Sequence, residues 1–211
     1  MKKAFTLSEV LITMGIIGIV AAITLPVIIN KINKRIIETQ LKSFYSTFNN
    51  ALTNYYNDNE LSSFKDTIMG NEEISQTEKT QLLVDEFLKR YIKGKAQNIT
   101  INYKYLYGGA TIITYQYITD SGTTIGIKEG LWNSVQTIYF DVNGKKQPNI
   151  IGIDAFRFYI YEKPITLAAY KRLTDWDCHN CADSCRTDLN PEASGWGCWI
   201  RILQEGRITY Y

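Results

Sequence analysis

The N-terminal part of the chain is a long apolar stretch. Between Phe5 and Ile29 the only charged residue is Glu9 and the only proline is Pro26. The twenty residues from Val10 onward form, at ~1.5 Å rise per residue, a helix that spans the ~30 Å hydrocarbon layer of a bilayer. We therefore predict a membrane-spanning helix over residues 10–29.

Beyond Pro26 the pattern changes to one apolar stripe with charged residues between. The apolar positions recur in steps of mostly three and four: Ile28, Ile29, Ile32, Ile36, Ile37, Leu41, Phe44, Tyr45, Phe48, Ala51, Leu52 and Tyr55. This spacing is typical of a helix that lies on a globular domain. We predict one helix over residues 5–57 and a globular domain over 58–211, with Pro26 kinking or loosening the helix because it removes a backbone hydrogen bond.

A second, shorter helix is predicted after a polar loop. Ser75 and Glu78 have the S-x-x-E spacing of a capping box, in which the two side chains satisfy backbone amides at the start of a helix. An apolar stripe from Val84 to Ile92 follows, and Gly94 is expected to end the element. This helix is predicted to pack on the domain core.

From Asn98 the apolar period drops to two, which indicates β-strands. The predicted strands cover residues 99–107, 113–117, 123–127, 135–142 and 155–161. Short turns at 108–109 and 120–122 imply an antiparallel sheet, with one face against the long helix and the other facing water. The fold class is therefore α+β, and residues 199–211 are expected to form a final edge hairpin.

Composition excludes several classes of function. The chain has 23 Lys and Arg against 21 Asp and Glu, so it lacks the excess of positive charge that would indicate nucleic acid as a partner. A G-x-x-x-x-G-K-[ST] loop is missing from the sequence, so no nucleotide-driven motor is expected. No acid, base and nucleophile converge in the sequence, and we do not expect an enzyme.

Glu9 needs an explanation, because an ionisable side chain in a membrane span costs ~2–3 kcal/mol by insertion scales. A plain membrane anchor does not explain this carboxylate. A secretory signal peptide, cut near Val20-Ala21-Ala22, has a shorter apolar region than the one present here. Glu9 is therefore predicted to have a cationic partner.

The residues around Glu9 match a known signal. The sequence Phe5-Thr6-Leu7-Ser8-Glu9 follows a short basic leader and precedes the apolar helix. It resembles the class III signal of type IV pilins and type II secretion pseudopilins. The resemblance implies that a prepilin peptidase cuts between Ala4 and Phe5, removes the leader 1–4 and methylates the new amino terminus. Ala4 stands where that family usually has Gly, so slower processing is expected at worst.

The resemblance also implies a function. A minor pilin or pseudopilin assembles by helix packing into a type IV pilus or secretion pseudopilus, and Pro26 matches a helix-loosening proline of the family. The Glu9 carboxylate would pair with the Phe5 amine of a neighbouring subunit, and loss of one member of such a pair costs ~3–5 kcal/mol. The alternative is a membrane-anchored extracytoplasmic binding module or adhesin that does not polymerise.

Partners and location follow from the same resemblance. The expected partners are the prepilin peptidase, other pilin or pseudopilin subunits, an assembly platform of the inner membrane, and membrane lipid. The chain is expected to cross the inner membrane once, with its C-terminal domain outside the cytoplasm, and then to enter the filament.

The loop around Asp141, Asn143 and Asp154 carries oxygen side chains that suit Ca²⁺. An EF-type loop starting at Asp141 would need an oxygen ligand at Lys145 and an acid at Gly152, and it has neither. A plain turn is therefore favoured. Some pseudopilins bind calcium in a loop of the globular domain, so calcium stays open, and no other cofactor is predicted.

The four cysteines, Cys178, Cys181, Cys185 and Cys198, all lie in one predicted C-terminal loop over residues 178–198. Together with His179 they could form a zinc site. Outside the cytoplasm disulfides form and persist, so two disulfides are favoured, in any of three connectivities. The resemblance agrees, because pilins often pin their C-terminal loop with a disulfide.

Overall fold

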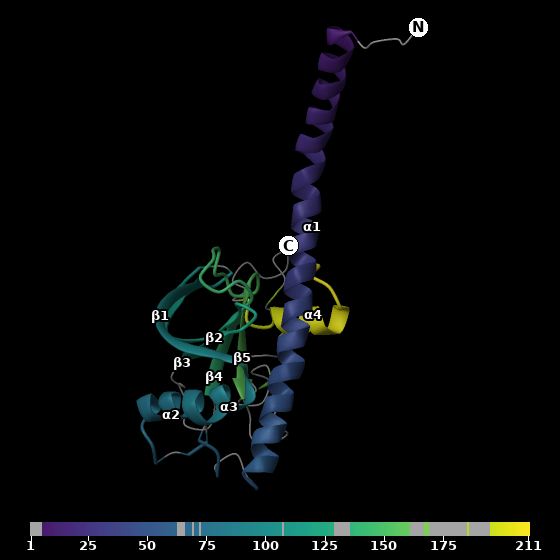
Figure 1. Cartoon of the computed structure of the whole chain (residues 1–211). Helices are drawn as coiled ribbons and strands as arrows, with labels where there is room; N and C mark the ends of the chain where they lie inside the picture. The colour runs from purple at the N-terminus through teal and green to yellow at the C-terminus, as the bar shows by residue number, and fades with distance from the viewer. Residues whose placement is uncertain are drawn as a thin grey trace.

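The computed structural model describes residues 6–62, 66–68, 70–71, 73–106, 108–128, 136–160, 167–168, 185 and 195–211. One long helix, α1 (Leu7–Asp58), projects from a domain whose sheet and shorter helices lie beside its C-terminal half (Figure 1). The predicted α+β class, with a long N-terminal helix on an antiparallel sheet, is confirmed.

Helix α1 begins with a capping box that the sequence analysis did not identify. The Glu9 amide donates to the Thr6 hydroxyl at 3.3 Å, and the Glu9 carboxylate accepts from the Thr6 amide at 2.8 Å. The helix continues through Pro26 and ends at Asp58, one residue beyond the predicted end. Its 52 residues correspond to a length of ~78 Å.

The two halves of α1 have different surroundings. The most apolar 18-residue window has no buried residue, and large apolar side chains from Leu7 to Ile36 are exposed. The first buried residue of α1 is Leu41, followed at helical spacing by Phe44, Phe48, Ala51, Leu52 and Tyr55. The predicted change from an all-apolar surface to one buried stripe is confirmed. The first half therefore lacks an apolar environment within the described chain.

Within the part of the chain that the structure describes, the sheet contains six strands in sequence order, each antiparallel to the next. They are β1 (Gly94–Lys104), β2 (Ala110–Thr119), β3 (Thr124–Lys128), β4 (Gln136–Asp141), β5 (Ala155–Ile160) and β6 (Leu167–Ala168). The alternation of apolar residues predicted the first five. It missed β6 because two residues are too few to show an alternating pattern.

Aromatic rings join α1 to one face of the sheet. Phe44 stacks on Phe140 of β4 with a centroid distance of 3.9 Å, and it lies 5.4 Å from Phe158 of β5. Phe48 is 1% exposed and contacts the ring of Phe87 at 5.4 Å. These contacts anchor the second half of α1 as the central element of the domain core.

The second face of the sheet is also buried, so the prediction that it faces water was wrong. Gln116, Thr124, Tyr139 and Asp141 on this face are at most 2% exposed. The cause is the segment after β4, which returns across the face and pairs Ile150 with Lys104 at the end of β1. The alternation of residues within a strand does not predict a loop that covers the sheet from elsewhere in the chain.

A short helical segment covers the end of the domain farthest from the N-terminus (Figure 1). It consists of α2 (Gln76–Leu82), a π-helical turn η2 (Leu83–Leu88) and α3 (Lys89–Tyr91). The Ser75 hydroxyl accepts from the Glu78 amide at 3.3 Å, which confirms the predicted cap. The buried residues of η2, including Phe87, confirm that this helix packs on the core.

The predicted C-terminal hairpin was wrong. Residues Cys198–Glu205 form helix α4, and Gly206, with φ of 74°, ends it in the left-handed conformation. Trp199 and Ile202 are buried three positions apart, which is the spacing of a helix. In eight residues this spacing is easily confused with the alternation of a strand.

After α4 the chain returns along α1 as an extended strap, residues 206–211. Three α1 side chains at four-residue spacing hold it. Lys42 donates to the Gly206 carbonyl at 2.7 Å, Glu38 accepts from the Ile208 amide at 2.6 Å, and Lys34 donates to the Tyr211 carbonyl. The spacing places one contact on each turn of the helix, so the strap is fixed to one face of α1.

Phe48→Ala is expected to lower the free energy of unfolding by about 3–5 kcal/mol, because it leaves a cavity between α1 and the core. Guanidinium denaturation of the full chain in detergent micelles measures this loss. Ile36→Ala, which trims a side chain that is 47% exposed, is the matched control and should leave the midpoint almost unchanged. Equal losses for the two variants would contradict the assignment of the core to the second half of α1.

Candidate functional site

Of the predicted processing and assembly residues, Glu9 and Pro26 lie in α1. Ala4 and Phe5 fall outside the described residues. Glu9 is exposed on the first turn, where its carboxylate accepts from both the amide and the hydroxyl of Thr6, at 2.8 and 2.9 Å. The T-x-x-E spacing was the sequence signal for this box. The box holds the carboxylate against Thr6 at the helix start.

The apolar helix that follows presents small residues as well as large ones. A side chain added at Gly15 or Gly18 would meet no atom within 4 Å, so both positions are open on the helix surface. Gly18 and Ala22 have the small-xxx-small spacing that lets helices approach closely. Their role in helix packing stays a prediction, as does that of Pro26.

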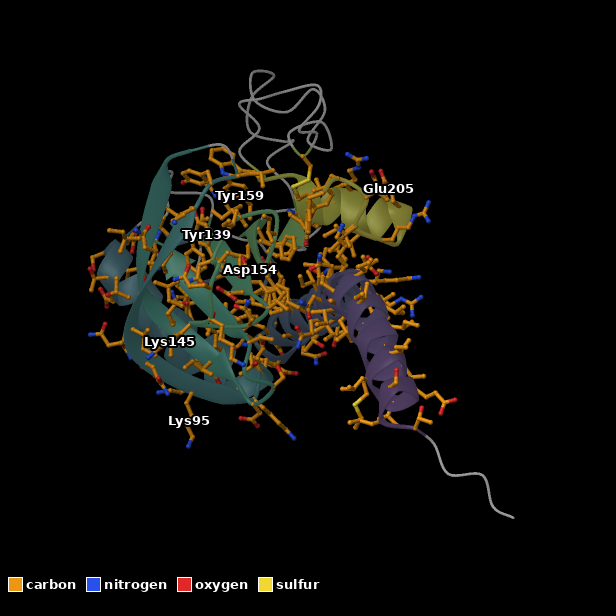
Figure 2. The ribbon with its side chains drawn as sticks, turned by 90° about the horizontal axis from the view of Figure 1, so that it is seen from above. Lys95, Tyr139, Lys145, Asp154, Tyr159 and Glu205 are labelled. Carbon is orange, nitrogen blue, oxygen red and sulfur yellow. A yellow bond between two sulfur atoms is a disulfide. The ribbon has the colours of Figure 1, made fainter. Side chains whose placement is uncertain are left out.

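The structure brings together the three residues predicted for calcium. The Asn143 amide donates to Asp141 Oδ1 at 3.0 Å, and its side-chain Nδ2 donates to Asp154 Oδ2 at 3.1 Å. Asp154 also accepts from the amides of Asn149 at 3.0 Å and Ile150 at 2.7 Å. Figure 2 shows Asp154 in the interior, between the sheet and α1. The two carboxyl groups therefore organise the loop after β4 from within.

Both carboxyl groups are almost fully buried, Asp141 with 0% and Asp154 with 2% exposure. Burial, and next the nearby charge of Asp154, raise the pKa of Asp141 to about 8. Burial also raises the pKa of Asp154, although the hydrogen bonds that its carboxylate accepts from Ile150, Asn149 and Asn143 act to lower it. At neutral pH this arrangement favours a proton on Asp141.

Several buried oxygen atoms on the same face and in the loop after β4 lack a hydrogen-bond partner among the described residues. They belong to Tyr103, Gln116, Thr124 and Asn143. Thr124 pairs directly with Asp141 in the register of β3 and β4, and the charge of Asp141 is one cause of a raised pKa at Tyr103, after burial. A protonated Asp141 would offer one hydrogen-bond donor to these oxygens, whereas a cation would be coordinated by them. The residue types fit both a turn in which Asp141 is protonated and a site for a calcium ion.

The cysteine prediction is confirmed for one pair. Cys185 and Cys198 form a disulfide, which removes two of the four thiolates that the zinc alternative would use. Cys178, Cys181 and His179 lie outside the described residues, so their pairing stays a prediction. The bond ties α4 to a segment 13 residues earlier in the chain.

Two glycines allow the disulfide region to lie against the loop after β4. A side chain on Gly195 would come 2.2 Å from the Ile151 carbonyl, and one on Gly152 would come 2.8 Å from Cys198 Sγ. Both glycines have positive φ, 80° and 94° respectively, which L side chains rarely adopt. The loop, the disulfide and α4 therefore form one packed unit.

The buried Asp141 predicts a pH-dependent stability. Its folded pKa of about 8 lies above its ordinary value of 3.8, so between these values the folded chain holds a proton that the unfolded chain releases. The free energy of unfolding should therefore fall as pH rises through this window, by at most ~1.4 kcal/mol per pH unit. Denaturant titrations across the window measure this slope. Asp141→Asn should flatten it, whereas the exposed control Asp120→Asn should keep it.

The same titrations test calcium. An ion held by Asp141, Asn143 and Asp154 needs both carboxylates ionised, so added calcium would stabilise the domain more at pH 8 than at pH 5. Asp141→Asn would abolish that stabilisation. If added calcium leaves the free energy of unfolding unchanged at both pH values, the loop is a turn held by a protonated Asp141 and not a calcium site.

The disulfide prediction concerns stability. Loss of a cross-link that closes a loop of this size costs ~3 kcal/mol in the chain-entropy model. Cys198→Ser should therefore lower the free energy of unfolding by about this amount, and the double variant Cys185→Ser/Cys198→Ser should lose no more. Denaturation curves of each variant under non-reducing conditions provide the comparison. A double variant as stable as the original chain would contradict a stabilising bond.

Two family models match the chain. A model of the prokaryotic N-terminal methylation motif matches residues 1–25, and a model described as a family of unknown function (DUF6613) matches residues 27–177. No curated protein and no solved structure matches. The first match confirms the pilin-type signal predicted around Glu9. The second covers more than half of the chain, which is therefore a member of the family of unknown function DUF6613, preceded by a prepilin-type methylation signal.

Proposed function

We propose that this chain is a minor pilin or pseudopilin that enters a type IV pilus or secretion pseudopilus after removal of residues 1–4. The signal itself implies processing by a peptidase and partners of the pilin type in general. The proposed role is structural rather than catalytic. Its site of action is the first half of α1.

The observation that carries the proposal is the exposure of that half. The large apolar side chains from Leu7 to Ile36 are at least 36% exposed, although the same helix is tightly packed from Leu41 onward. Lipid covers such a surface in the membrane, and the equivalent helices of neighbouring subunits would cover it in a filament. Without one of these environments the exposed apolar surface would drive aggregation.

The capping box gives Glu9 two states in this proposal. In the single chain its carboxylate is satisfied by Thr6. In a filament, the same carboxylate would pair with the methylated amine of Phe5 on a neighbour. Such a pair sets the axial register, since a misaligned subunit would leave both charges unpaired in an apolar surrounding.

Two variants of Glu9 separate capping from charge. Glu9→Gln keeps an acceptor for the Thr6 amide, because Gln also serves in a capping box, but it removes the charge. We expect this variant to be cut and methylated normally. Its amount in sheared filaments should fall tenfold or more, because an unpaired charge costs about 3 kcal/mol per subunit incorporated. Glu9→Ala, which loses both functions, should assemble equally poorly.

Ser8→Ala is the matched control, because it alters the same turn without touching the charge or the box. Assembly is measured by immunoblotting sheared filaments against whole cells, and processing by intact mass. Normal assembly of Glu9→Gln would contradict the charge-pair mechanism. A chain that is processed but never enters filaments, with or without Glu9, would instead favour the membrane-anchored binding module.

A further inference from the structure

A cleft of about 880 Å³ separates α1 from the loop after β4. One wall is α1 from Asn30 to Gln40, and the other is the loop from Val142 to Asp154. Tyr211, at the end of the strap, also lines it. In Figure 1 the C-terminal residue lies beside α1 at the end of the domain nearest the exposed half of the helix. The cleft therefore begins where the exposed apolar surface gives way to the domain.

The position of the cleft along α1 places it at a membrane surface. The span 10–29 ends one residue before Asn30, the first residue that lines the cleft. The headgroup layer on each side of a bilayer is about 5–8 Å thick. Lys34 lies five residues beyond Ile29, which is ~7.5 Å along the helix axis. When α1 spans a bilayer, the wall of the cleft from Asn30 to Lys34 therefore lies at the level of the lipid headgroups.

The charges of the cleft are those of an anion site. Lys34 and Lys146 line opposite walls. The ammonium of Lys34 gives one hydrogen to Tyr211 and has two more to donate. Among the side chains of described residues that line the cleft, Asp154 supplies the one carboxyl group, and it is 2% exposed with both oxygens already accepting hydrogen bonds.

Neighbouring groups strengthen this character. Lys31, Arg35 and Lys145 are exposed and adjoin lining residues in the sequence. The amide side chains of Asn33 and Gln147 line the cleft and can donate to phosphate oxygens. The cleft therefore combines positive charge, neutral donors and a position at the membrane surface.

From these observations we infer that the cleft binds the phosphate headgroup of an anionic phospholipid. Lys34 and Lys146 hold the phosphate from opposite walls, and the acyl chains lie along the apolar surface of α1 above Asn30. The inference relies on the membrane anchoring of α1 and not on polymerisation. The bound lipid seats the domain against the membrane before a subunit leaves it.

Native mass spectrometry of the full chain in neutral detergent micelles tests this site. Phosphatidylglycerol, titrated in, should be retained at one tight site, and phosphatidylcholine with the same acyl chains should not. Each lysine near the headgroup contributes about fivefold to the affinity. Lys146→Gln should therefore bind the anionic lipid about fivefold more weakly, and Lys34→Gln/Lys146→Gln about 30-fold more weakly. Lys146 makes the cleaner single test, because Lys34 also holds the strap.

The matched control is Lys89→Gln/Arg90→Gln, which removes two exposed cations from α3 at the opposite end of the domain. It should bind the lipid like the original chain. Hydrogen exchange of residues 142–154 should slow with phosphatidylglycerol alone. Equal retention of phosphatidylcholine, unchanged binding by Lys146→Gln, or the same protection by inorganic phosphate without lipid would overturn the inference.

Discussion

The unbroken hydrogen-bonded backbone of α1 joins two parts of the chain that need different surroundings. Its first half is apolar on every side and has no partner within the described domain, whereas its second half buries one stripe against the sheet. The backbone of a helix satisfies its own hydrogen bonds, so the same element can pass from lipid to a folded domain without a costly break. Every proposed function of the chain depends on this change of environment near Asn30.

The rest of the domain is built to hold that helix. The sheet packs its aromatic face on α1, and the C-terminal strap adds polar contacts with Lys34, Glu38 and Lys42. The second face of the sheet is sealed by the loop after β4, which encloses Asp141 and Asp154. Because α4 and its disulfide pack on this loop, the buried carboxyl pair, the strap and the cleft beside α1 belong to one connected region.

Periodicity predicted the elements that are long enough to repeat. The stripe from Leu41 to Tyr55, the Ser75 cap and five strands were all visible in the sequence. The eight residues of α4 were misassigned because Trp199 and Ile202 fit two patterns over so short a segment. The burial of Asp141 was not predictable, since it depends on a loop that pairs with β1, a strand distant in the sequence. The motif at Glu9 predicted its signal, but not the capping box that occupies its carboxylate in the single chain.

The proposed processing makes a methylated Phe5 the first residue of the mature chain, directly before the Thr6 that caps α1. Intact-mass spectrometry of the protein from its native membranes tests this claim most directly. The expected protein lacks residues 1–4, carries one N-methyl group, and gains mass on reduction because Cys185 and Cys198 are joined. A chain that retains Met1, or that begins near Ile23 after cleavage of a secretory signal, would contradict it.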